Sequence, residues 1–252
     1  MSKRHDSLGI KHVIRPEWIE KTVNLWLAGF SPKEIRQELD DYLSSRKQSG
    51  GIGIRGAQSY PKAITILMRS LITPPVELIE FSKNTKRMLK KSVTEHERMA
   101  LYWGAISATY PFWFNVARQI GRLLNLQDQI TKKQIVQRLK EQYWDRQTVS
   151  RVARYVIRSF IAWDVLQDAA VKGCYEKGEI LSIDNMRIVS LLLEGALHTI
   201  PDGKSSTNNL YDNPGFYMFD FPRMAGDLVA QTNPSIEVMR FGMDDEILKL
   251  RE

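Results

Sequence analysis

The chain has 252 residues, of which 43% are hydrophobic and 26% are charged, and its formal net charge is +7. This composition is that of a globular protein with room for two or three compact modules, and it excludes an intrinsically disordered chain. The single cysteine, Cys174, excludes an internal disulfide and a cysteine-rich zinc cage, and no apolar run reaches the roughly 18–20 residues of a membrane span. We therefore expect a cytoplasmic protein that does not enter a membrane.

The first quarter of the chain has strong helix start and stop signals. A helix is predicted to begin at Arg15–Pro16 and to end before Gly29, a residue suited to the position after a helix. Ser31 is the predicted cap of a second helix, and a third spans Pro61 to Ile72. Two helices joined by so short a turn are typical of a helix-turn-helix module.

A glycine-rich stretch, residues 44–56, separates the second and third of these helices. It contains a literal G-x-G-x-x-G, but a dinucleotide site needs a buried strand before that motif, and here the polar end of a helix precedes it. We interpret the stretch as a flexible loop. Its three cations are candidate phosphate contacts: Arg46, Lys47 and Arg55.

After Pro74–Pro75 the sequence predicts a helix from Val76 to about Lys91. The C-terminal half of that helix is basic, and its candidate contacts to nucleic acid are Lys86, Arg87 and Lys90. A capping box at Thr94 begins the next helix, and an aromatic, apolar helix covers residues 112–126. We interpret these two as core helices that bury Trp103 and Trp113.

The region from Gln129 to Asp184 carries the clearest functional pattern. Thr131 can cap a helix that begins at Lys132, because its hydroxyl can accept from the Gln134 amide. The next predicted helix, residues 146–165, is apolar on one face and carries three arginines on the other. After it, Tyr175 and Ile180–Leu181 flank a loop with Gly178, which predicts a β-hairpin. Helix, turn, basic helix and hairpin are the order of a winged helix-turn-helix.

Such a module binds duplex DNA by placing its second helix in the major groove. The alternative is that these arginines form a solvated helix face, which is the usual role of a row of charged residues. Two acids, Asp145 and Asp164, lie only at the ends of the helix, so ion pairing along the helix does not explain the row. The candidate DNA contacts of this region are Lys132, Lys133, Arg146, Gln147, Arg151, Arg154, Arg158, Lys172 and Lys177.

The last third differs in character. A helix is predicted over Asn185 to His198, and the turn-rich segment from Pro201 to Gly215 resembles an exposed loop. Residues 216–252 contain short apolar runs that suit short strands or docking segments, and no function is assigned to them. The predicted fold is mainly α, with two helix-turn-helix or winged-helix-like modules and short β-hairpins. Its three regions are residues 1–75, 76–183 and 184–252.

The charge is concentrated in the middle of the chain. Residues 60–160 hold 18 Lys and Arg against 7 Asp and Glu, a surplus of +11, so the remainder carries −4 of the total +7. A localised basic region favours a polyanionic partner, because affinity for DNA comes largely from neutralised phosphates.

The sequence offers no convincing active site. Its four histidines are scattered, without a second ligand at the spacing of a zinc site. Asp202 and the distant Glu246–Lys249 resemble a metal-dependent nuclease pattern only superficially, since the lysine follows its glutamate by three positions rather than two. We therefore expect no enzymatic activity, no metal and no cofactor.

The middle third of the chain contains a series of short motifs: Tyr110–Pro111–Phe112, Gly121–Arg122–Leu123–Leu124, Ile130–Thr131, Arg138–Leu139, Arg158, Trp163, Val165–Leu166 and Lys172–Gly173. In these motifs the chain resembles the BrxA family of BREX phage-defence systems. The resemblance implies a small, mostly helical, non-catalytic protein that binds DNA through winged-helix-like domains, and other BREX proteins as partners. The leading hypothesis is thus a double-stranded DNA-binding protein. A structural adaptor with an acidic protein partner and an RNA-binding protein remain as alternatives.

Overall fold

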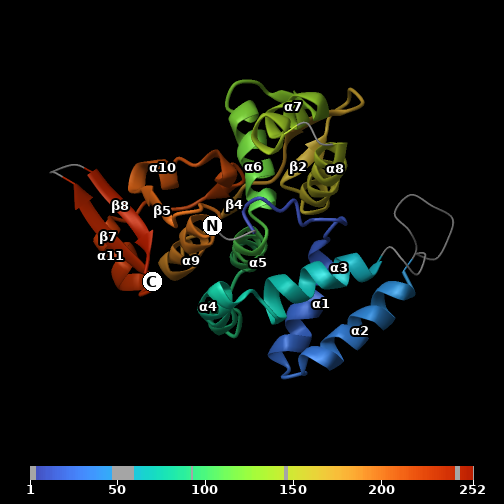
Figure 1. The fold of residues 1–252 in the computed structure, drawn as a ribbon, viewed down its shortest axis with the longest axis horizontal. Helices are drawn as coiled ribbons and strands as arrows, with labels where there is room; N and C mark the ends of the chain where they lie inside the picture. Colours follow the sequence, from blue (N-terminus) through green and yellow to red (C-terminus); the bar gives the residue numbers. More distant parts are fainter. Residues whose placement is uncertain (1–3, 47–59, 92, 145–146, 242–244, 252) are drawn as a thin grey trace.

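The computed structural model describes residues 4–46, 60–91, 93–144, 147–241 and 245–251. These ranges contain eleven α-helices and eight short strands, so the predicted mainly α fold is confirmed. Figure 1 shows α5 (Glu95–Thr109) near the middle of the molecule, with the N-terminal helices below it and the C-terminal strands to one side. One continuous cluster of buried apolar side chains runs from Ile10 to Leu248.

Helices that pack around α1 form the N-terminal part. Its elements are α1 (Pro16–Leu27), α2 (Pro32–Ser44), α3 (Tyr60–Leu67) and a π-helical turn, η1 (Met68–Ile72), that continues α3. The predicted cap is confirmed, because the Ser31 amide donates to Glu34 Oε2 over 2.7 Å while Ser31 Oγ accepts from the Glu34 amide over 3.4 Å. Gly29 adopts φ +90°, a backbone conformation that favours glycine. The predicted G-x-G-x-x-G lies outside the described residues.

Aromatic side chains fill the centre of the molecule. A 3-10 turn, η2 (Val76–Leu78), leads into α4 (Ile79–Leu89), and α5 and α6 (Pro111–Leu124) follow. The side chains of Trp103 and Trp113 are 1% and 0% exposed, as predicted. The ring of Phe160 lies 4.9 Å from the ring of Trp103 and 4.8 Å from that of Trp113, so the central helices and α8 (Gln147–Ala162) share one core.

A three-stranded antiparallel sheet lies beside two helices, α8 and the preceding α7. The remaining elements here are β1 (Gln129–Thr131), α7 (Lys132–Tyr143), β2 (Leu166–Asp168) and β3 (Cys174–Lys177). The strand order is β1-β3-β2, with Tyr175 opposite Ile130 on one side and Asp168 on the other. The capping box predicted at the start of α7 is confirmed, since Thr131 accepts from the Gln134 amide.

The predicted hairpin around Gly178 is wrong. The hairpin joins β2 to β3 through residues 169–173, where the Cys174 amide donates to the Val171 carbonyl over 3.0 Å and Gly173 has φ +84°. Gly178 instead lies where β3 ends against the preceding chain, and a Cβ there would be 2.6 Å from the Val165 carbonyl carbon. A glycine at the end of a strand marks either a turn or a close backbone approach, and only the pairing partner of the strand distinguishes them.

The C-terminal third contains two further sheets around α9 (Met186–Leu197), whose predicted start is confirmed by the Asn185 cap. The first is a parallel pair of β4 (Leu181–Ser182) and β6 (Phe219–Asp220). The other has the order β5-β8-β7 and comprises β5 (Lys204–Ser206), β7 (Ile236–Phe241) and β8 (Asp245–Leu250). The connecting elements are α10 (Thr207–Tyr211), a 3-10 turn η3 (Pro214–Phe216) and α11 (Gly226–Thr232).

The predicted exposed loop over residues 201–215 is wrong in part, because the segment contains β5, α10 and η3. Leu210 is fully buried in α10, and Gly215 is buried in η3 against the ring of Phe114. On α6, Gly121 lets the Pro214 backbone approach so closely that an added Cβ would be 2.8 Å from the Pro214 carbonyl carbon. Gly215 and the Pro214 backbone thus serve close packing, while Pro201, Asn208 and Asn209 are exposed.

Across the described ranges, every helix is too short or too polar to cross a bilayer. Nor do the His, Cys, Asp and Glu side chains of those ranges form a group of three or more that could hold a metal ion.

Candidate nucleic-acid interface

Helix α8 has the two faces that its sequence predicts. Val149, Val156 and Phe160 are fully buried on one side. On the other side, Arg151, Arg154 and Arg158 are exposed. The buried stripe follows the 3.6-residue period, so the arginines are held outward by the packing of the opposite face.

The N-terminal segment runs along the side of α8, between α8 and α3 (Figure 1). Two hydrogen bonds hold it there. The Ile14 amide donates to Ser159 Oγ over 2.9 Å, and Trp163 Nε1 donates to the Ile14 carbonyl over 3.1 Å. The His12 ring is stacked on Tyr155 with centroids 6.3 Å apart. These contacts bring Lys11 to the edge of the arginine face, although the sequence separates them by well over a hundred residues.

The three arginines of α8 have different surroundings. Arg158 Nη1 donates to Asp168 Oδ2 over 2.7 Å, and both side chains are 50% exposed. The partner of Arg158 comes from β2 and not from α8 itself, so ion pairing along the helix still does not explain the row. The Arg154 guanidinium lies 5.8 Å from the Tyr155 ring centroid. The side chain of Arg151 has no ion pair or hydrogen bond with any described residue, so its charge is available to a ligand.

The β2–β3 hairpin adds cations next to α7. The Lys132 amide donates to the Gly173 carbonyl over 3.2 Å, which places the hairpin loop at the first turn of α7. Lys132 is half-buried there, while Lys133 and Lys172 are exposed. Lys177 is exposed at the other end of β3, opposite Leu166. Lysines from two elements thus gather at the hairpin loop.

We call the following set the α8 surface: Lys132, Lys133, Gln147, Arg151, Arg154, Arg158 and Lys172. Gln147, the first residue of α8, is exposed. The predicted contact Arg146 lies outside the described residues.

The basic row of α4 lies elsewhere. Figure 1 shows α4 below α5, and α7 and α8 above it. Lys86 is half-buried with its Nζ 4.6 Å from the Trp26 ring centroid, and burial, with a smaller contribution from Lys90, lowers its pKa. Arg87 donates to Asn84 Oδ1 over 2.8 Å, and Lys90 is exposed. The predicted site residues of α4 therefore do not join the α8 surface.

Of the three cations of the glycine-rich stretch, only Arg46 is among the described residues. Arg46 is exposed after α2, with its guanidinium 4.4 Å from the Tyr42 ring centroid. Lys47 and Arg55 lie outside the described residues.

Two cations that the sequence did not indicate lie beside the α8 surface. Lys11 and Lys62 line a hollow of about 220 Å³ together with Arg151 and Tyr155. No local pattern marks either lysine, since each stands alone in its own segment. Only the packing of residues 10–14 and α3 beside α8 brings them to Arg151.

Comparisons with protein-family models, with curated proteins and with solved structures find no match to this chain. The resemblance to the BrxA family accordingly stays a prediction from the sequence.

Proposed function

We propose that this protein binds double-stranded DNA without catalysing a reaction, and that the α8 surface is the contact. The observation that supports it most is the array of exposed cations on α8 and the β2–β3 loop, with Arg151 unneutralised by described residues. Affinity of this kind comes from phosphates neutralised by lysine and arginine.

The proposal includes a winged helix-turn-helix over residues 111–177. Helix α6, strand β1, helices α7 and α8, and the β2–β3 hairpin follow in that order, with β3 paired between β1 and β2. In such a module α8 would lie in the major groove and the hairpin loop would reach a flanking phosphate. The α1–α2 pair, joined by a four-residue turn over 28–31, is proposed as the second helix-turn-helix-like unit.

The side chains of α8 suit both kinds of contact that such a helix makes. Arg151 and Arg154 can bind phosphates or pair with guanine, and Gln147 can pair with adenine. The ion pair of Arg158 with Asp168 orients that guanidinium rather than leaving it for a base. A role beside other BREX proteins, which the BrxA resemblance implies, belongs to the same proposal.

A mobility-shift assay with duplex DNA, single strands and structured RNA tests the proposal. Arg151→Ala/Arg154→Ala/Arg158→Ala should weaken duplex binding by roughly tenfold or more, since each good base contact is worth about 1–3 kcal/mol. The matched control removes three exposed cations from the C-terminal third: Arg187→Ala/Lys204→Ala/Arg251→Ala. Equal loss in both variants, or none in either with the fold intact by circular dichroism, would refute the α8 surface as the contact. Preference for RNA, or for an acidic protein, would favour the alternatives.

A further inference from the structure

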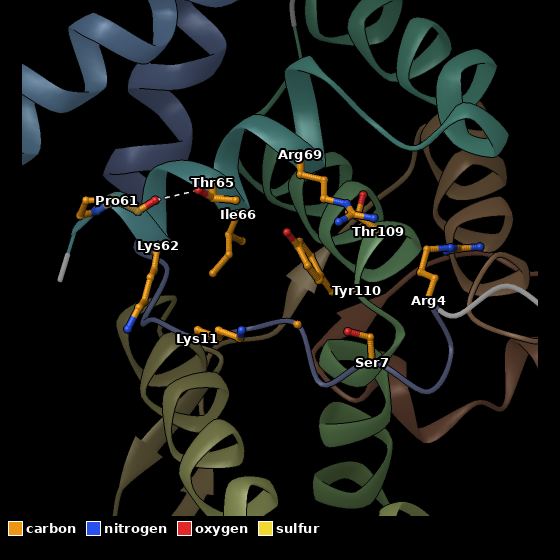
Figure 2. Close-up of a pocket in the computed structure, with 11 residues that line it drawn as sticks. Arg4, Ser7, Lys11, Pro61, Lys62, Thr65, Ile66, Arg69, Thr109 and Tyr110 are labelled. Atoms are coloured by element: carbon orange, nitrogen blue, oxygen red, sulfur yellow. Dashed lines mark hydrogen bonds between the residues drawn. The ribbon is translucent and has the colours of Figure 1, made fainter. Parts of the chain in front are cut away.

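A second, larger cavity lies between the N-terminal segment, α3 with η1, and the end of α5 (Figure 2). Its volume is about 650 Å³. The residues that matter here are Lys11, Lys62, Ile66, Arg69 and Tyr110. Among the described residues that line the cavity, four are cationic and none is acidic.

Described residues leave three of these cations without a neutralising acid. Lys11, Lys62 and Arg69 are exposed and have no ion pair with a described residue. The fourth, Arg4, is engaged by Glu77 at 3.3 Å and by the Ala108 carbonyl, and Figure 2 shows its guanidinium directed away from the other lining residues. Clustered like charges raise the free energy of the empty cavity, and an anion would relieve that cost.

Close packing fixes the position of the Tyr110 ring at one side of the cavity. Gly9 has φ +52° and lies against the Tyr110 ring, where an added Cβ would be 2.8 Å from Cε1, so only glycine allows this approach. Figure 2 shows the hydroxyl of Tyr110 directed between Ile66 and Arg69. Burial raises the pKa of Tyr110 to about 12, against a smaller opposing effect of Arg69. The phenol therefore stays protonated near neutral pH and can donate to an anion.

The cavity adjoins the hollow beside the α8 surface. It shares Gly9, Lys11 and Lys62 with the hollow that contains Arg151. The cations thus form a series from Arg151 on α8, through Lys11 and Lys62, to Arg69 on η1. We call this series the cleft track.

We propose that the cleft track binds one nucleic-acid strand, with its phosphodiester groups on Lys11, Lys62 and Arg69. The proposal rests on the proposed function, since the strand would extend from a duplex held on the α8 surface. A cavity of about 650 Å³ is in the range of small-molecule sites, roughly 300–1,000 Å³, and does not admit a duplex. A basic groove that follows the backbone is how proteins hold single strands.

The test is fluorescence anisotropy. The probes are a blunt duplex, the same duplex with a 5′ or a 3′ single-stranded tail, the free strand, and a mononucleotide. We expect a tail to strengthen binding about tenfold, a gain of about 1.4 kcal/mol. Lys11→Ala/Lys62→Ala/Arg69→Ala should abolish that gain. Arg69→Ala alone should reduce the gain and leave blunt-duplex affinity within about twofold, because Arg69 belongs neither to the α8 surface nor to the hollow that contains Arg151. Tyr110→Phe, which keeps the ring against Gly9, should reduce the gain.

The outcomes separate the two proposals. A tail that adds nothing, or a gain that survives the triple variant, overturns the cleft track while blunt-duplex binding still supports the α8 surface. Mononucleotide binding that needs the three cations, without a tail effect, also overturns it in favour of a small-ligand site. A free strand that binds through Lys11, Lys62 and Arg69 while the blunt duplex does not bind supports the cleft track and refutes the proposed function. The variant Arg187→Ala/Lys204→Ala/Arg251→Ala is again the charge-matched control.

Discussion

Arg158 Nη1 on α8 lies 2.7 Å from Asp168 Oδ2 on β2, so one arginine of the exposed row is paired by a residue ten positions later. The pair is half-exposed, and pairs of this kind contribute little to stability, about 0–1 kcal/mol. Its larger effect is electrostatic, because a carboxylate stands within the surface proposed to meet phosphates.

Asp168→Asn should therefore strengthen duplex binding by roughly two- to fivefold, because it removes the negative charge and frees Arg158. The measurement is the dissociation constant at fixed salt, with Asp184→Asn as a control at an exposed acid outside the α8 surface. Unchanged or weaker binding by Asp168→Asn, with unchanged thermal stability, would contradict the placement of phosphates near Arg158.

Duplex binding should depend steeply on salt. With the six cations of the α8 surface neutralising phosphates together, log K should fall linearly with log salt at a slope of about −4 to −5, near −0.9 per phosphate. The Arg151→Ala/Arg154→Ala variant should reduce the magnitude of the slope by about 2. Isothermal titrations over a series of salt concentrations measure it. An affinity that does not change with salt would instead favour an apolar, protein-adaptor interface.

Phe160→Ala should lower the free energy of unfolding by about 3–5 kcal/mol, the cost of a large truncation in a packed core. The ring is fully buried with Trp103 and Trp113 rings within 5 Å, so the cavity has little means to collapse. Urea unfolding followed by tryptophan fluorescence measures the loss. Ile161→Ala, at a half-buried position next to it, is the comparison and should cost much less. Similar losses at both positions would show that this aromatic cluster does not dominate the core.

The two glycines that flank β3 should respond differently to alanine. Gly178→Ala places a Cβ 2.6 Å from the Val165 carbonyl carbon and should destabilise by about 3 kcal/mol, the upper end for overpacking. Gly173→Ala meets no atom within 4 Å and should cost only about 1 kcal/mol, for its φ of +84°. Thermal unfolding of both variants checks the order. A larger cost at Gly173 would contradict the strand pairing described for β2 and β3.

Local features of this protein were determined by its sequence alone. The capping boxes at Ser31, Thr94 and Thr131 and the two faces of α8 are all confirmed. Each depends on residues within about four positions of one another, because a cap joins the first helical turn and an apolar stripe repeats every 3.6 residues. Short-range signals of this kind do not change when distant parts of the chain move.

Only the tertiary structure decided which distant segments meet. The pairing of β3 with β2 and the burial of Leu210 differ from the sequence prediction, and the ion pair of Arg158 with Asp168 was not part of it. A strand of three or four residues contains little information about its pairing partner, and the partner of a surface charge depends on which elements lie beside it. Burial of Ile10 and Ile14 against the core places residues 10–14 between α3 and α8. This packing brings Lys11 and Lys62 to Arg151.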